Sequence, residues 1–145
     1  MLAAPPSANL VVLRSGDIDR AATFYSAMGL LFMKHSHGTG PEHYSSEVAG
    51  FVFEIYPINS TQLPTTSVRI GFSVDDVDSV IRLLEEVGGK IVSPPKDSEW
   101  GRRAVIKDLD GHSVELITPP NRDKMKDGLT ETHADGMTPG DRSKR

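Results

Sequence analysis

The chain has 145 residues, of which 37% are hydrophobic and 25% charged, values typical of one globular domain with a hydrophobic core. Its formal net charge of -4, with no dense basic run before the C-terminal end, argues against a nucleic-acid-binding surface. The absence of cysteine excludes disulfides, thiol nucleophiles and Cys-ligated zinc, so any metal ligand must be His, Asp or Glu.

The N-terminal segment, MLAAPPSANL, lacks the basic start and the apolar core of a secretory signal. No apolar run approaches the roughly 18 to 20 residues that are needed to span a bilayer. We therefore expect a cytoplasmic protein that binds neither membranes nor nucleic acid.

The first half of the chain predicts a short N-terminal arm, residues 1–8, and then five elements. A strand is expected over Asn9–Arg14, followed by a helix with Asp17 as its N-cap and Gly29 at its end. Three short strands follow the helix, over residues 30–34, 42–47 and 51–56.

The last of these strands, FVFEIYP, contains an acid among apolar and aromatic residues. A charged carboxylate in such a strand costs several kcal/mol unless a cation, a metal or hydrogen-bond donors contact it. Because successive side chains point to opposite faces, Phe53 and Ile55 should lie under the helix, with Glu54 and Tyr56 on the other face. The partner of Glu54 is therefore central to the function.

The second half predicts the same order of elements after a Pro-containing connector, residues 58–67. A strand over Val68–Val74 precedes a helix that Asp76 caps and Gly88 ends. The three strands that follow are expected over residues 90–92, 103–107 and 113–117. A polar C-terminal tail, residues 119–145, completes the chain and is expected to be flexible.

The two halves align with each other almost without gaps, which indicates a duplicated module. The matched positions are helix N-caps, helix ends, turn glycines and strand acids: Asp17 with Asp76, Gly29 with Gly88, Gly50 with Gly111, and Glu54 with Glu115. The pattern predicts an α+β fold of two βαβββ modules, residues 9–57 and 68–118. A partly polar sheet face that carries both acids favours a pocket over a core.

Several of these features resemble the vicinal oxygen chelate superfamily, which includes glyoxalase I, bleomycin-resistance proteins and extradiol dioxygenases. They are the gapless modules, the helix DIDRAATFYSAMGL, the segment WGRRAVIKDLDGHSVELI and the repeated acid. The segment GTGPEHYSSEVAGFVFEIYP resembles a glyoxalase-related subgroup of unassigned chemistry. The resemblance covers about Asn9–Thr118. It implies modules paired into a curved mixed sheet enclosing a cleft, a small-molecule ligand and a homodimer.

The same resemblance implies four metal positions, commonly two His and two acids. In this chain the acids are Glu54 and Glu115, but the His positions fall on Leu10 and Arg69. Leucine has no donor atom, and arginine stays protonated. An extradiol dioxygenase is therefore not expected. We expect the Arg69 guanidinium to lie beside Glu115 and to replace the charge of the metal.

The position of His43 depends on the register of the predicted hairpin. A four-residue connection pairs His43 with Glu54, whereas a two-residue turn at Ala49 and Gly50 pairs Ser45 with Glu54 and leaves His43 diagonal on the same face. A three-residue loop turns His43 away. His43 is accordingly a displaced metal ligand, a general base oriented by Glu54, or a structural histidine.

Other candidates have weaker support. His35 and His37 alternate in KHSH, but with no acid nearby in the sequence a solvated strand edge is favoured over a metal site. His112, after the DLDG turn, is expected to be exposed. Trp100, Gly101, Arg102 and Arg103 are expected to open a strand at the rim of the pocket. There the indole and a guanidinium either bind an anionic or planar ligand or only pack.

Three functions follow from these residues. The first is an atypical lyase or isomerase, in which His43 or Glu54 moves a proton next to a carbonyl and Arg69 stabilises the oxyanion. The second is a non-catalytic protein that sequesters a small molecule. The third is a divalent-metal enzyme with Glu54, Glu115 and His43 as ligands. Only the third needs a cofactor. The predicted ligand-binding residues are Arg69, Glu115, Tyr56, Trp100 and Arg102.

Overall fold

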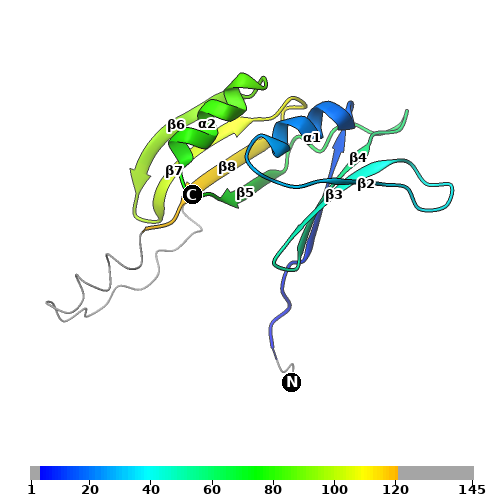
Figure 1. Ribbon diagram of the computed structural model, residues 1–145, viewed down its shortest axis with the longest axis horizontal. Coiled ribbons are helices and arrows are strands. Elements are labelled where there is room, and N and C mark those ends of the chain that lie inside the picture. Colours follow the sequence, from blue (N-terminus) through cyan, green and yellow to red (C-terminus); the bar gives the residue numbers. More distant parts are fainter. Residues whose placement is uncertain (1–3, 121–145) are drawn as a thin grey trace, which may run out of the picture.

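The computed structural model describes residues 4–120 and shows two βαβββ modules (Figure 1). The first module contains β1 (Leu10–Ser15), α1 (Ile18–Ser26), β2 (Met33–His35), β3 (His43–Val48) and β4 (Phe51–Pro57). The second contains β5 (Arg69–Ser73), α2 (Val77–Glu86), β6 (Lys90–Ser98), β7 (Gly101–Lys107) and β8 (Ser113–Thr118). The predicted C-terminal tail lies, from residue 121 onward, outside the described residues.

Each module forms its own four-stranded mixed sheet, in the order β1-β4-β3-β2 or β5-β8-β7-β6. The outer strand β1 runs parallel to β4, and β5 runs parallel to β8, while the remaining pairs are antiparallel. The repeated order of elements and the repeated topology confirm the predicted fold. The two sheets are open and separate within one chain.

The helices begin and end where the sequence predicts. The side chain of Asp17 accepts a hydrogen bond from the Arg20 amide, and that of Asp76 accepts from the amides of Asp78 and Ser79. Gly29 and Gly88 then follow the helices with φ of 108° and 98°, a conformation that glycine adopts without steric cost.

Strand β6 is much longer than the predicted 90–92 segment, because it continues through Pro94 and Pro95. Proline removes a backbone donor, and the pairing of β6 with β7 is shifted between Ser93 and Lys96. The strand tolerates both prolines because it lies at the edge of its sheet.

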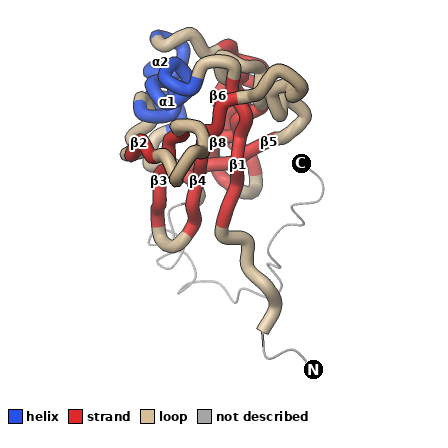
Figure 2. Tube along the Cα trace, turned by 90° about the vertical axis from the view of Figure 1, so that its right-hand side faces the viewer, coloured by secondary structure: helices blue, strands red, loops and turns tan. Residues whose placement is uncertain are grey.

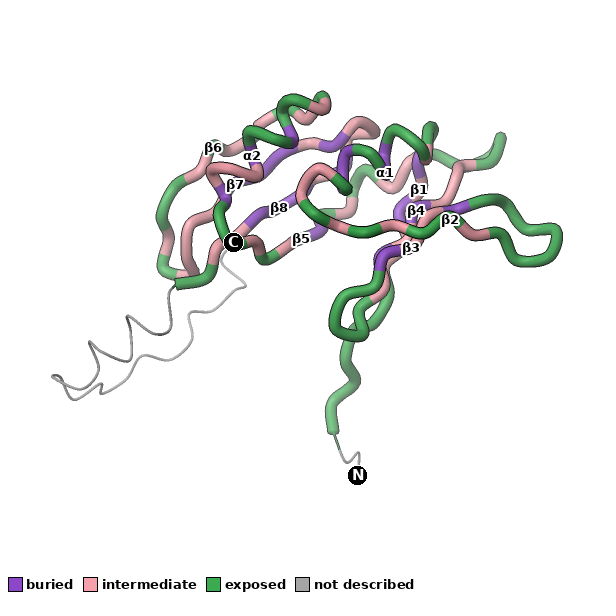
Figure 3. Tube along the Cα trace, viewed as in Figure 1, coloured by how far each residue is buried: buried purple, intermediate pink, exposed green. Residues whose placement is uncertain are grey.

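One hydrophobic core joins the modules on the side that carries both helices (Figures 2 and 3). The Tyr25 ring of α1 lies 4.8 Å from that of Phe53 in the first sheet and 6.0 Å from that of Phe72 in the second, centroid to centroid. The alternate residues of the strands, including Glu54 and Glu115, therefore belong to the sheet faces turned away from the helices.

A buried polar network also joins the modules. The Tyr25 hydroxyl donates to Asp108 over 2.6 Å, and the Ser15 hydroxyl donates to Asp110 over 2.6 Å. His112 contacts Asp108 through Nδ1 and Thr65 through Nε2, both at 2.8 Å. The expectation that His112 is exposed is wrong, since the turn after β7 folds onto the first module and leaves this residue 1% exposed.

Neither helix in the described part of the chain, residues 4–120, is long and apolar enough to cross a bilayer.

Candidate functional site

The open face of the first sheet carries Glu54 at its centre. Parallel pairing places Val12 beside Glu54 and Arg14 beside Tyr56. Phe53 and Ile55, which alternate with these residues, are buried in the core. The predicted division of β4 into an apolar and a polar face is therefore confirmed, and the Glu54 side chain remains 18% exposed.

The β3–β4 hairpin has the second of the three predicted registers. Ala49 and Gly50 form a two-residue turn with φ of 52° and 82°, values typical of a type I′ turn. This turn pairs Ser45 with Glu54. His43 consequently lies diagonal to Glu54, with Nε2 of the imidazole 3.4 Å from Oε2 of the carboxylate.

The His43 imidazole is buried and held in one orientation. Its ring stacks on that of Tyr56 at 4.1 Å, and its Nδ1 lies 3.2 Å from the Pro41 carbonyl oxygen. A carbonyl only accepts hydrogen bonds, so this contact needs a proton on Nδ1. On the other side of Tyr56 the Arg14 guanidinium lies 5.0 Å from the ring centroid.

The second acid, Glu115, has a cationic partner that was not predicted for it. Oε1 of Glu115 lies 2.7 Å from Nη2 and 2.9 Å from Nε of Arg103, on the neighbouring strand β7. Arg69 is exposed and pairs in register with Ser113. Arg103 therefore neutralises Glu115, a role that was expected of Arg69. A contribution of Arg69 stays a prediction.

Strand alternation contained the signal for Arg103. Ala104 and Ile106 of β7 are buried in the core, so Arg103 must point to the open face. Arg102 points to the helix side instead, where it donates to Asp78 over 2.6 and 3.0 Å and to Asp97 over 3.1 Å. The pair with Asp78 anchors β7 to α2, and the pair with Asp97 links β7 to β6. A role of Arg102 in ligand binding stays a prediction.

The predicted site residues divide between the two sheets. Glu54, His43 and Tyr56 lie on the first sheet, whereas Glu115 and Arg69 lie on the second. The half-buried Trp100 lies in the turn between β6 and β7. One chain thus presents two separate polar faces.

The four metal positions implied by the family resemblance do not fit a metal in this chain. Leu10 offers no donor atom, Arg69 is a permanent cation, and Glu115 is already bound to Arg103. Within the described residues, the potential metal ligands whose donor atoms do approach one another are Asp108, Asp110 and His112, which belong to the buried polar network.

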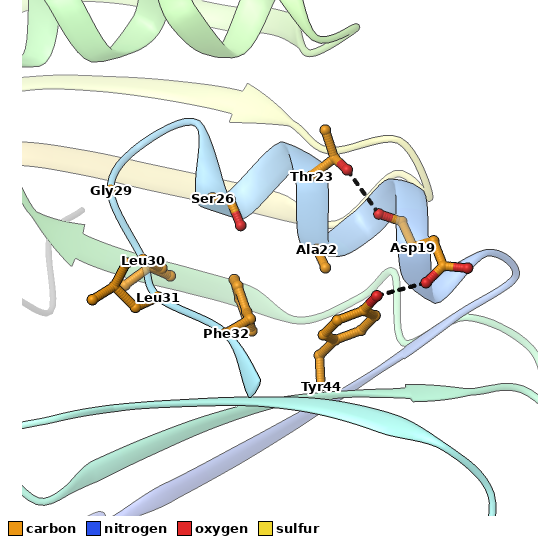
Figure 4. Close-up of a pocket in the computed structure, with 9 residues that line it drawn as sticks. All are labelled: Asp19, Ala22, Thr23, Ser26, Gly29, Leu30, Leu31, Phe32 and Tyr44. Atoms are coloured by element: carbon orange, nitrogen blue, oxygen red, sulfur yellow. Dashed lines mark hydrogen bonds between the residues drawn. The ribbon is translucent and has the colours of Figure 1, made fainter. Parts of the chain in front are cut away.

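A cavity of about 510 Å³ lies on the helix side of the first module (Figure 4). It is bounded by α1, the segment that follows α1, and Tyr44 of β3, whose hydroxyl donates to Asp19 over 2.6 Å. None of the predicted site residues lines this cavity. The chemistry-bearing residues therefore lie on the open sheet faces rather than in this hollow.

The fold is one of paired βαβββ modules, with one acid on the open face of each sheet. The sequence model of the glyoxalase/bleomycin resistance protein/dioxygenase superfamily matches residues 7–116. The chain belongs to this superfamily.

Two kinds of relative are similar to the chain. The lactoylglutathione lyase GLX1 of Arabidopsis thaliana is 28% identical over 119 residues, which are 74% of this chain but only 42% of that protein. The chain therefore spans less than half the length of this relative. An uncharacterized protein of Mycolicibacterium smegmatis is 27% identical over 113 residues, 78% of this chain and 94% of that one.

Among solved structures, TnmS3, an antibiotic binding protein from Streptomyces sp. CB03234, superposes with a TM-score of 0.65. It is 26% identical, and the match covers 80% of this chain and 98% of that chain. The hypothetical protein SA1046 from S. aureus, which is 23% identical with a TM-score of 0.63 over 78% and 96% of the two chains, shares the fold.

Proposed function

We propose that the chain is an atypical lyase or isomerase that moves a proton next to the carbonyl of a small anionic substrate. The observation that carries this proposal is the pairing of Glu54 with His43 at 3.4 Å. One partner is a partly exposed carboxylate and the other is a buried, oriented imidazole, which together can accept and hold a proton.

The exposures of the two side chains assign their roles. Glu54 is 18% exposed, whereas the His43 side chain is 2% exposed behind Tyr56. A general base must come within hydrogen-bond reach of the proton that it removes. Glu54 is therefore the base that contacts the substrate, and His43 is the positioning residue that fixes the carboxylate.

A second copy of the chain completes the cleft. The two modules of one chain share a core on the helix side, and the acids lie on separate open faces. Opposing the first-module face of one protomer to the second-module face of another would bring the exposed Arg69 towards Glu54. There the guanidinium would stabilise the oxyanion that forms as the proton leaves. A cytoplasmic location remains part of this proposal.

The likeness to an antibiotic binding protein favours a second candidate, a protein that sequesters a small molecule without turnover. The face that includes Tyr56 and Arg14 suits a planar or anionic ligand. The third prediction, a divalent-metal enzyme with Glu54, Glu115 and His43, has less support. It needs Glu115 to leave Arg103 and to meet residues of the other sheet.

The decisive experiment uses protein that a chelator has stripped of metal. NMR in D₂O measures how fast the protons next to the carbonyl of small 2-oxo compounds exchange with deuterium. Wild type should accelerate exchange, and Glu54→Gln should lower kcat by about 100-fold or more, the usual contribution of a general base. Glu47→Gln, which changes an exposed carboxylate on β3, is the matched control and should keep wild-type kcat.

Light scattering under the same conditions should give the mass of a dimer. Binding of these compounds without exchange would establish the sequestering function instead. A monomer that neither binds nor exchanges them would contradict both candidates.

A further inference from the structure

Three histidines gather at one edge of the first sheet. His35 in β2 lies directly opposite His43 in β3, and their ring centroids are 5.8 Å apart. A turn closed by the Gly40 amide on the His37 carbonyl brings His37 back over the same edge, with its ring 5.3 Å from His43 and 6.1 Å from His35. With Glu54 the cluster has four potential metal ligands, three of which lie around the buried His43 imidazole.

The Nε2 atom of His43 is the group in this cluster that could take a ligand. It is buried and has no hydrogen-bond partner within residues 4–120. Since the contact with Pro41 needs the proton on Nδ1, neutral His43 has a lone pair on Nε2, which then meets a lone pair of the Glu54 carboxylate. A positive charge at Nε2, either a proton or a metal ion, makes this contact favourable.

The distance between the two atoms is also compatible with two ligands of one metal ion. An N–H···O hydrogen bond has its donor and acceptor about 2.7 to 3.2 Å apart, whereas Nε2 and Oε2 are 3.4 Å apart. Two ligand atoms that each lie about 2.1 Å from one zinc ion, at the tetrahedral angle, are separated by about 3.4 Å. His43 and Glu54 are thus already spaced as two ligands of one ion.

We infer that His35, His37, His43 and Glu54 bind one divalent transition-metal ion, with Zn²⁺ as the best match. Imidazole and carboxylate are ordinary zinc ligands, and four of them complete a tetrahedral shell. The donor atoms of the four residues do not yet converge. His43 and Glu54 form the fixed half of the site, and the more accessible rings of His35 and His37 close it by rotating about their side-chain bonds.

The cluster of Asp108, Asp110 and His112 shows why proximity alone does not identify a site. Its donor atoms lie within 4.8 Å of one another, but they already have partners. Asp108 accepts from Tyr25, from His112 and from three backbone amides, and Asp110 accepts from Ser15 and the Gly16 amide. A metal there would have to break a satisfied buried network, whereas at His43 it satisfies an atom that lacks a partner.

This inference goes beyond the proposed function. It uses four residues of the first module, needs neither Glu115 nor a second protomer, and is tested with the metal alone. Metal binding can therefore fail while the proton exchange of metal-stripped protein succeeds, and the reverse can also occur.

The experiment is a calorimetric titration of the chelator-stripped full chain with Zn²⁺ and no substrate. We expect one ion per chain with a micromolar or tighter Kd. His35→Gln and His37→Gln should each weaken binding at least about tenfold, the loss that follows even when an outer partner of a metal ligand is removed. Both side chains lie at the accessible edge of the sheet, so the variants should fold.

Two controls make the result specific. His133→Gln removes a histidine outside residues 4–120, and Asp110→Asn alters the Asp108 cluster. Each should keep the wild-type Kd. Bound Co²⁺ should show the visible absorption of a four-coordinate ion. Binding no tighter than millimolar, or a His35→Gln/His37→Gln double variant with wild-type affinity, would overturn the inference.

Discussion

Glu54 and Glu115 occupy equivalent positions in the two modules, but their partners give them different chemistry. Glu115 lies against the permanent cation of Arg103, so its charge is neutralised within its own sheet. Glu54 lies against an imidazole, which can gain or lose a proton or bind a metal. The two equivalent acids therefore have different neighbours, a permanent cation for Glu115 and a titratable ring for Glu54.

At the residue scale, the Arg103–Glu115 pair predicts that replacing Arg103 destabilises the protein more than replacing Arg69 does. Arg103→Met should lower the free energy of unfolding by about 3 kcal/mol, because it leaves a mostly buried carboxylate without its cation. Arg69→Met, the matched control on the same open face, should cost less than about 0.5 kcal/mol. Urea unfolding followed by circular dichroism compares them. Equal losses for both variants would mean that Arg69 also neutralises Glu115.

Among the elements, the β3–β4 hairpin has the largest influence on the site. Its two-residue turn fixes the register, and a shift by one residue would move His43 to the other face of the sheet. Ala49 adopts a φ of 52°, which is unfavourable for a residue with a β-carbon. The geometry of the site therefore depends on a turn whose sequence is not optimal for its conformation.

This strain predicts that Ala49→Asn stabilises the protein by about 0.5 to 1 kcal/mol, since Asn-Gly is the preferred sequence of a type I′ turn. Gly50→Ala, at a φ of 82°, should destabilise it by about 1 kcal/mol. Thermal unfolding measured by calorimetry would show both effects. A turn of another type would leave both melting temperatures unchanged.

On the scale of the whole molecule, the network around Asp108 holds the modules together. Burial raises the pKa of Asp108, but hydrogen bonds from His112 and Tyr25 outweigh burial and lower that pKa below its ordinary value of 3.8. Burial, and then the charge of Asp108, raise the pKa of Tyr25 well above its ordinary value of 10.0, so the phenol stays protonated and donates. The network thus depends on a charged Asp108.

The sign of the pH dependence follows from that lowered pKa. The folded state keeps Asp108 charged more readily than the unfolded state, so this contribution is fully present above about pH 4 and is lost as the pH falls further. Asp108→Asn should cost about 2 kcal/mol at pH 7 and flatten the fall in stability below pH 4. Urea unfolding between pH 7 and 2 measures this, with the exposed Asp75→Asn as a control. If the free energy of unfolding fell in parallel with pH for wild type and Asp108→Asn, the predicted role of the Asp108 charge would be contradicted.

The sequence by itself determined the duplicated fold and the face on which each acid lies. Caps such as Asp17 and Asp76, glycine helix ends and the alternation of the strands are local signals, because backbone geometry fixes them within a few residues. The largest differences are the proline-containing strand β6 and the turn that buries His112.

Tertiary structure alone decided the partners of those acids. A guanidinium on β5 or on β7 is equally plausible for Glu115 from the sequence, because β8 has a neighbour on each side. The gathering of His35, His37 and His43 depends on strand pairing and on one turn that folds back. Such contacts join residues that are distant along the chain or separated by a loop. Their distances follow from packing, which no local pattern encodes.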